Sequence, residues 1–251
     1  MLTVIIIAKN EQHNIRQCLE SVAWADELIV LDSGSTDNTI TLAKEFTTNV
    51  FSTDWQGYGI QKQRALERAT GDWVLNLDAD ESVDKGLKQQ IIHEMAADKI
   101  DAFRIPIQMY FCGKPLRYSS SPTRHIRLFK RQGARYSNDI VHEKIILPEN
   151  ARVGQLSNAI VHHSFQDVSH ALYKINRYSS YSAKIRIEDK KKASLCKTLM
   201  SSSWMFFRCY LLQLGFMDGK EGFLFALLNA QGSFYRGIKQ LYQDRELHKL
   251  P

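Results

Sequence analysis

Long apolar runs are missing from this 251-residue chain. No run reaches the roughly 18 residues that a membrane-spanning helix needs, and residues 2–8 are too short and lack the basic flank of a secretory signal. The chain has four cysteines, and none shows the paired spacing of a disulfide framework or a metal site. Reduced thiols of this kind are typical of a cytosolic protein, so we expect a cytoplasmic location.

Signatures of several enzyme classes are also absent. The sequence has no P-loop and no G-x-S-x-G elbow. Gly57-Tyr58-Gly59 lacks the third glycine of a dinucleotide loop, because position 62 is Lys. His142-Glu143 does not continue into the zinc-protease motif H-E-x-x-H, because position 146 is Ile.

Composition and charge describe a globular chain with a basic end. Hydrophobic residues make up 44% and charged residues 24%, enough for one sizeable core and a smaller appendage. The net charge of +6 is uneven, because residues 170–251 hold 14 basic and 6 acidic side chains. A basic region of this kind binds nucleic acid or an anionic membrane surface, or is a solvated charged face.

Short β-branched runs alternate with helical patterns over the first hundred residues. Residues 2–8, 27–31 and 73–77 have the composition of strands buried on both faces. Helices are expected from Asn10, as a cap, to about 22, after the turn at 33–37, and over 61–69. This alternation predicts an α/β fold with a mostly parallel sheet flanked by helices.

The pattern changes after residue 100. Extended stretches such as 102–109 and 125–129, separated by turn residues, predict an antiparallel or mixed addition to the sheet, and helices follow over 168–187, 195–214 and 221–242. We therefore expect a domain over 1–165, with halves 1–100 and 101–165, and a helical, basic region over 166–251.

Acidic side chains follow the predicted parallel strands. Asp32 ends the second strand, Asp78-Ala79-Asp80 follows the third, and Asn10-Glu11 follows the first. Ligands of open α/β sheets bind beyond the carboxyl ends of the strands. Two carboxylates one residue apart at such an edge suit Mg²⁺ or Mn²⁺, which bridges to substrate phosphates. The alternative is a pair of solvated carboxylates that open a helix.

A second group of residues offers a general base. Asp139-Ile-Val-His142-Glu143 lies in the later half, and we favour Glu143 over Asp139, although a surface glutamate in a strand is an equal alternative. His162 or His163 is a candidate to complete a metal shell, unless both are structural. Basic candidates for a diphosphate are Lys62, Arg64, Arg124 and Arg127.

The combination of motifs resembles a known family. Ile7-Ala-Lys-Asn-Glu11, Leu31-Asp-Ser-Gly-Ser-Thr-Asp37 and Leu77-Asp-Ala-Asp-Glu81 together are similar to glycosyltransferase family 2, which has the GT-A fold. Val141-His-Glu143 and the segment 215–223 further resemble lipopolysaccharide-core β-1,4-glucosyltransferases of the WaaE (KdtX) type. The resemblance covers nearly the whole chain.

The resemblance implies an inverting, metal-dependent hexosyltransferase. It would move a sugar, glucose in the first instance, from UDP-glucose to an inner-core heptose of lipopolysaccharide at the cytoplasmic membrane face. The implied nucleoside contacts are Ala8, Asn10, Glu11 and Asp32. The implied diphosphate and metal groups are Asp78 and Asp80, to which we add His163 as a ligand and Lys62 and Arg64 as donor contacts. Glu143 would be the base. The resemblance makes residues 1–165 a GT-A catalytic domain, with the nucleotide-sugar-binding half over 1–100 and the acceptor half over 101–165.

The C-terminal region has two interpretations. Residues 204–216 are broadly apolar and follow a basic cluster at 184–192, which suits a peripheral helix on an anionic membrane surface. Packing of a helical pair on the catalytic domain is the alternative. A nucleic-acid partner is not expected.

Two other functions compete with sugar transfer. A nucleotidyltransferase that makes a nucleotide-sugar normally has a glycine-rich loop after the first strand, and residues 9–12 contain no glycine. A non-catalytic adaptor that uses the basic tail leaves the acidic strand ends unexplained. Another family 2 transferase with a different sugar or acceptor remains the nearest alternative.

Overall fold

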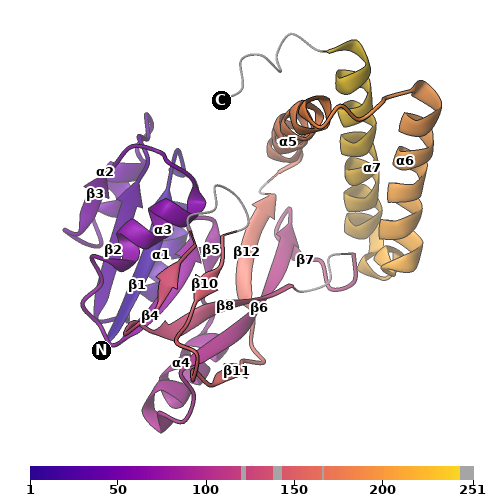
Figure 1. Cartoon of the computed structure of the whole chain (residues 1–251). Helices are drawn as coiled ribbons and strands as arrows, with labels where there is room; N and C mark the ends of the chain where they lie inside the picture. The colour runs from indigo at the N-terminus through magenta and orange to yellow at the C-terminus, as the bar shows by residue number, and fades with distance from the viewer. Residues whose placement is uncertain (120–122, 138–142, 166, 244–251) are drawn as a thin grey trace. The chain divides into compact units, whose positions relative to one another are not determined.

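The computed structural model describes residues 1–119, 123–137, 143–165 and 167–243, which form two compact units (Figure 1). The sheet unit contains Met1–Gln108 and Thr123–His163. The helical unit contains the described parts of Met109–Pro122 and Ser164–Pro251. None of the described helices is long and apolar enough to cross a membrane.

A parallel half-sheet forms the first part of the sheet unit. Its strands are β1 (Leu2–Ala8), β2 (Glu27–Asp32), β3 (Val50–Ser52) and β4 (Trp73–Asp78), in the spatial order β3-β2-β1-β4. Every residue of β1 is buried, as in a central strand that is covered on both faces. The three predicted strands are confirmed, and β2 and β4 each continue into the aspartate that follows.

The connecting helices are α1 (Ile15–Val22), α2 (Thr39–Ala43) and α3 (Tyr58–Leu66). The prediction that Asn10 caps the first helix is wrong. Asn10 has a φ of 57°, and its Oδ1 accepts a hydrogen bond from the backbone N–H of Thr36 at 2.8 Å. Asparagine tolerates this left-handed conformation, so it turns the chain after β1 and fastens the turn to the next loop.

The second half of the sheet is mainly antiparallel. β8 (Thr123–Lys130) pairs antiparallel with β4, and the order continues through β6 (Ala102–Phe111), β12 (Ile160–Phe165) and β5 (Glu81–Ser82). The predicted mixed addition to the sheet is therefore confirmed. The remaining elements are α4 (Lys85–Ala97), β7 (Lys114–Pro115), β9 (Arg135–Tyr136), β10 (Ile145–Ile146) and β11 (Val153–Gln155).

Two apolar clusters cover the two faces of the parallel strands. Alternate residues of β1 point to opposite faces, so Val4 and Ile6 join one cluster while Ile5 and Ile7 join the other. With both faces filled, only the strand ends remain for polar side chains.

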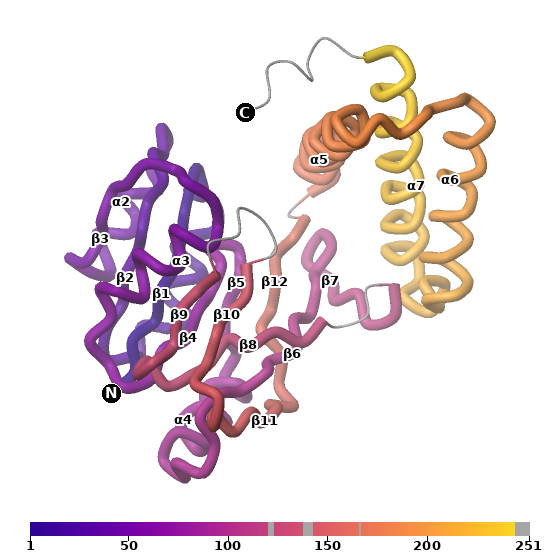
Figure 2. The backbone as a smooth tube through the Cα atoms, in the orientation of Figure 1, coloured from indigo at the N-terminus to yellow at the C-terminus, as the bar shows by residue number. Residues whose placement is uncertain are grey.

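The helical unit consists of α5 (Val168–Glu188), α6 (Leu195–Phe207), η1 (Arg208–Leu212), η2 (Gly215–Asp218) and α7 (Gly219–Tyr242). Figure 2 traces α6 and α7 side by side in opposite directions. The three predicted helices are confirmed, and the segment expected as one helix over 195–214 is α6 followed by the π-helical turn η1.

The boundary between the units differs from the expected break after residue 165. Besides the described residues from Ser164 onward, the helical unit also includes the described residues 109–119, although that segment lies between two strands of the sheet unit in the sequence. Phe111 and Leu116 pack in one apolar cluster with Ala171, Phe225 and Leu228. A strand pattern cannot indicate which core its end residues join.

Candidate active site

Three strand ends meet at one edge of the parallel half-sheet. In the register of the sheet, Ala8 of β1 lies beside Asp32 of β2, and Ile7 lies beside Asp78 of β4. Asp80 follows in the short connection between β4 and β5. The edge predicted from the sequence therefore gathers the acidic side chains after β2 and β4.

Asp78 is held by two cations. Lys62 Nζ of α3 lies 3.2 Å from its Oδ1, and Arg127 Nη2 of β8 lies 2.9 Å from its Oδ2. Burial opposes ionisation, but the charges of Arg127 and Lys62 outweigh it and hold the pKa of Asp78 well below its ordinary value. Asp78 is thus a fixed anion whose two oxygens are already engaged.

Glu143 joins this cluster through the same lysine. Lys62 Nζ donates a hydrogen bond to Glu143 Oε1 at 2.7 Å, and the Lys62 and Glu143 side chains are only 7% and 17% exposed. A residue from the later half of the sheet unit is thereby placed at the Asp78 edge. The rival base Asp139 and the neighbouring His142 lie outside the described residues.

Arg127 also clamps the connection after β4 through Glu81. Its Nη2 lies 2.8 Å from Glu81 Oε1, while Glu81 Oε2 accepts the backbone N–H of Asp78 at 2.9 Å. Burial raises the pKa of Glu81 to about 7, and the charge of Asp78 adds to this although Arg127 opposes it. Glu81 was not among the predicted site residues, because a glutamate after Asp-x-Asp gives no sign of turning inward.

The carboxylate of Asp80 lies beside a histidine of β12. His162 Nε2 is 3.1 Å from Asp80 Oδ2. Burial opposes the charged imidazole, but the hydrogen bond and charge of Asp80 raise the pKa of His162 overall. His163 Nε2 lies instead 3.1 Å from Ser82 Oγ and 3.0 Å from Gln17 Nε2.

The expected ligand set of Asp78, Asp80 and His163 is not gathered. Across residues 1–119, 123–137, 143–165 and 167–243, no three acidic, histidine or cysteine side chains are placed so that they could hold a metal ion together. Adjacent residues of a strand point to opposite sides of the sheet, so His162 and His163 direct their imidazoles in opposite directions. The imidazole that points toward the carboxylate of Asp80 is that of His162.

The loops after β1 and β2 bind each other. Asp32 is fully buried, and its Oδ2 accepts the backbone N–H groups of Gly34 and Ser35 at 2.9 and 2.8 Å. The N–H of Asn10 donates to Ser35 Oγ at 2.8 Å, and that of Glu11 donates to Thr39 Oγ1 at 2.8 Å. Asp32 therefore shapes its own turn, while Asn10 and Glu11 form the adjoining rim.

The remaining basic candidates have other partners. Arg64 Nη1 lies 2.9 Å from Asp54 Oδ1, and Arg124 Nη1 donates to the carbonyl of Leu156 at 3.1 Å. No sequence motif singles out His125, which lies two residues before Arg127 on β8. Burial and the charges of Arg127 and Lys62 lower the pKa of His125.

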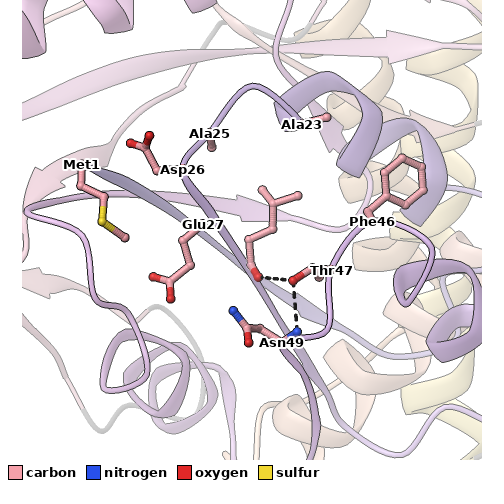
Figure 3. A pocket seen from close by; sticks show the side chains of 9 residues that line it. Met1, Ala23, Ala25, Asp26, Glu27, Phe46, Thr47 and Asn49 are labelled. Carbon is pink, nitrogen blue, oxygen red and sulfur yellow. Dashed lines mark hydrogen bonds between the residues drawn. The ribbon is translucent and has the colours of Figure 1, made fainter.

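A hollow of about 340 Å³ lies at the opposite edge of the sheet (Figure 3). It is lined by the starts of β1 and β2, including Asp26 and Glu27. Both carboxylates are used internally: Asp26 Oδ2 accepts the N–H of Leu2 at 2.6 Å, and Glu27 Oε2 accepts that of Thr70 at 2.9 Å. This hollow is structural, and the acidic carboxyl edge is the candidate site.

The family model and the sequence relatives show one family. The model of glycosyl transferase family 2 matches residues 3–146. The lipopolysaccharide core biosynthesis glycosyltransferase LpsC of Rhizobium meliloti is 32% identical over 266 residues, which cover 100% of this chain and 95% of that protein. An uncharacterized glycosyltransferase of Rickettsia felis is 29% identical, over 95% of this chain and 88% of that protein. The S. aureus TarS 1–349 structure in complex with UDP-GlcNAc aligns with a TM-score of 0.48 and 14% identity, over 96% of this chain and 91% of that chain.

Proposed function

Because this chain belongs to glycosyltransferase family 2, we propose that it moves a sugar from a UDP-sugar to a lipopolysaccharide inner-core heptose, with inversion. Glucose is the first sugar to test. The lipopolysaccharide step is supported by the name of the Rhizobium meliloti relative, a core biosynthesis glycosyltransferase that matches this chain from end to end. The observation that carries the chemistry is the cluster of Asp78, Lys62 and Glu143 beside the Asp80–His162 pair.

The nucleoside half of the donor is assigned to the two loops that bind each other. Ala8 ends β1 beside Asp32, and the exposed Asn10 and the partly buried Glu11 form the adjoining rim. We assign the direct contacts to Ala8, Asn10 and Glu11. Because the carboxylate of Asp32 is occupied by its own turn, Asp32 would act by holding the Gly34-Ser35 turn in shape.

The diphosphate is assigned to the Asp80 side of the edge. Lys62 is already shared by two carboxylates, and Arg64 is bound to the exposed Asp54, so neither is the main diphosphate contact. Lys62 instead positions Asp78 and Glu143. Arg127 performs the same task for Asp78 from the other side.

A divalent cation fits the Asp80–His162 pair. One carboxylate oxygen and one imidazole nitrogen, 3.1 Å apart, are a suitable partial set for Mg²⁺ or Mn²⁺, which in such sites takes few protein ligands and uses substrate phosphates for the rest. When bound, the cation would neutralise charge on the diphosphate leaving group. Asp78 would support the site by fixing the connection that carries Asp80.

Glu143 is the proposed base. In an inverting transfer the acceptor oxygen attacks the anomeric carbon while the bond from that carbon to the diphosphate breaks. The acceptor proton must leave at the same time, and a carboxylate within hydrogen-bond reach takes it. Glu143 is partly exposed at the same edge, and the ammonium of Lys62 keeps it in place.

The test uses a donor panel and a defined acceptor. Purified protein with Mn²⁺ and heptose-terminated core oligosaccharide is given UDP-glucose, UDP-galactose or UDP-GlcNAc, and UDP release is measured. We expect release with UDP-glucose and a β-linked product by NMR. An α-linked product would contradict inversion. Release of UDP from UDP-galactose or UDP-GlcNAc but not from UDP-glucose would show that glucose is not the transferred sugar. Formation of UTP in the presence of pyrophosphate would indicate a nucleotidyltransferase instead.

The acceptor also suggests a location. A lipopolysaccharide core is lipid-linked, so we propose that the enzyme works at the cytoplasmic face of the inner membrane, held there by its basic helical region. The exposed Lys190, Lys191 and Lys192 supply positive charge for anionic lipid.

A further inference from the structure

Helix α6 of the helical unit carries large apolar side chains on its solvent-exposed side. On a helix that packs on a protein core in water, apolar side chains face inward and polar ones face solvent. On α6 and the π turn that continues it, Met200, Trp204, Phe207 and Leu211 are 67%, 57%, 42% and 45% exposed. They recur at the helical spacing of one face, and we name them the outer row.

The middle of the side of α6 that meets α7 is polar. Ser201 Oγ lies 2.9 Å from Ser233 Oγ of α7, and Ser202 Oγ donates to the carbonyl of Ala230 at 2.8 Å. Thr198 is buried so close to Gly237 that a Cβ there would lie 2.3 Å from Thr198 Oγ1. Hydroxyl bonds and a small-residue contact thus join the middle of α6 to α7, and near its C-terminal end Phe206 packs edge-on against Phe223 of α7, with ring centroids 5.8 Å apart. Small and hydroxyl-bearing residues let two helices approach closely, which leaves most of the large apolar side chains of α6 on its outer side.

The exposed charges near the outer row in the sequence are mostly basic. Between residues 188 and 221 they are Lys190, Lys191, Lys192, Lys197, Arg208 and Lys220, against Glu188 and Asp189, and Asp189 is paired with Lys191 at 2.8 Å. The other acidic residues of this stretch have partners: the carboxylate of Asp218 accepts the backbone N–H groups of residues 117–119, and Glu221 is paired with Lys114 at 3.1 Å. An apolar face bordered by exposed cations complements a bilayer surface that carries anionic headgroups.

We propose that the outer row inserts into the interfacial layer of an anionic lipid bilayer, with the surrounding lysines and Arg208 on the headgroups. Trp204 and Phe207, whose ring centroids are 5.7 Å apart, are the residue types that favour the boundary between headgroups and acyl chains. The proposal rests on the membrane location proposed above and names the surface responsible for it.

The experiment measures vesicle binding by the full chain. Vesicles of phosphatidylcholine alone, and with phosphatidylglycerol added, are sedimented with the parent and with a triple variant carrying Trp204→Ser, Phe207→Ser and Leu211→Ser. A matched control carries Phe51→Ser, Trp55→Ser and Ile92→Ser, three exposed apolar side chains of the sheet unit. We expect the parent and the control to bind anionic vesicles and the outer-row variant to bind about tenfold or more weakly.

A second readout locates the contact. Brominated acyl chains should quench tryptophan fluorescence in the parent and in Trp55→Phe, and quench it much less in Trp204→Phe. UDP-glucose binding by the outer-row variant, expected to equal that of the parent, separates this result from the donor site. Equal vesicle binding by the outer-row variant and parent would overturn the proposal. So would a lipid-free oligomer that the outer-row substitutions dissociate, since a second copy would then cover this face.

Discussion

Lys62 Nζ donates a 2.7 Å hydrogen bond to Glu143 Oε1 across 81 positions of sequence. The bond joins helix α3, in the parallel half of the sheet unit, to the residue proposed as base. The same ammonium lies 3.2 Å from Asp78 Oδ1. The ammonium group of Lys62 therefore holds Asp78, at the end of β4, close to Glu143, the proposed base for the acceptor.

Replacing Glu143 with Gln should remove the base while keeping its shape. Turnover should fall by about 10²–10⁴-fold, the usual contribution of a general base, with UDP-sugar affinity retained. Steady-state rates and calorimetric binding of UDP-glucose check both parts. Asp139→Asn is the matched comparison. A near-normal rate for Glu143→Gln with a collapsed rate for Asp139→Asn would transfer the role to Asp139.

The pair itself can be measured by a double-mutant cycle. Lys62→Met, Glu143→Gln and the double variant should show non-additive losses of unfolding free energy. The expected coupling is about 1–3 kcal/mol, because the lysine and glutamate are largely buried. Urea unfolding at pH 7 supplies the values. The control cycle pairs Glu143→Gln with Arg64→Met, whose partner is Asp54, and should be additive. Additivity in both cycles would mean that the ion pair does not form in solution.

The two histidines of β12 should respond differently to substitution. Mn²⁺ should tighten UDP-glucose binding in the parent and in His163→Ala, and should do so much less in His162→Ala and Asp80→Ala, because His162 is the imidazole beside Asp80. Titration of donor affinity with and without Mn²⁺ is the measurement. The reverse order of the two histidine variants would restore His163 as the ligand.

Much of the fold followed from the sequence, because the informative segments are strongly patterned. The continuous β-branched runs of β1, β2 and β4 leave little alternative to buried parallel strands. The helices from residue 168 onward were also predicted from periodicity. The conformation of turns was harder to predict from the sequence: Asn10 was expected to cap a helix, but it is a turn residue with left-handed backbone conformation.

The candidate site was predictable only as a list of residues. Strand ends indicate which edge holds Asp32, Asp78 and Asp80, but not how each carboxylate is used. Asp32 turns back to the N–H groups of its own neighbours Gly34 and Ser35, whereas the role of Glu81 and the choice between the two adjacent histidines depend on partners far away in sequence. Local patterns contain no information on those contacts.

Asp218 should make the stability of the helical unit sensitive to acid. Its carboxylate accepts the N–H of Arg117 at 2.9 Å, of Tyr118 at 3.0 Å and of Ser119 at 2.7 Å. Burial opposes ionisation, but these bonds lower the pKa of Asp218 overall. A carboxyl with a depressed pKa stabilises the fold above its ordinary value, near 3.8, and that contribution is lost as pH falls through the lower folded value.

Asp218→Asn should therefore destabilise the protein by about 1.5–3 kcal/mol between pH 5 and 7, with the difference from the parent shrinking below about pH 3.8. Chemical unfolding across this range is the measurement. Asp189→Asn, at an exposed residue paired with Lys191, is the control and should change stability by less than about 0.5 kcal/mol. A difference that persists unchanged at pH 3 would show that packing, not charge, is lost.

The membership of residues 109–119 in the helical unit limits how this enzyme can be recombined with its relatives. A chimera made by joining a foreign C-terminal segment after residue 163 would keep Phe111 and Leu116 without their partners on α5 and α7. Acceptor choice, if it is carried by the helical unit, could therefore be exchanged only by grafting two separate stretches at once. Recombination between homologous genes at a single crossover would be expected to yield few working hybrids.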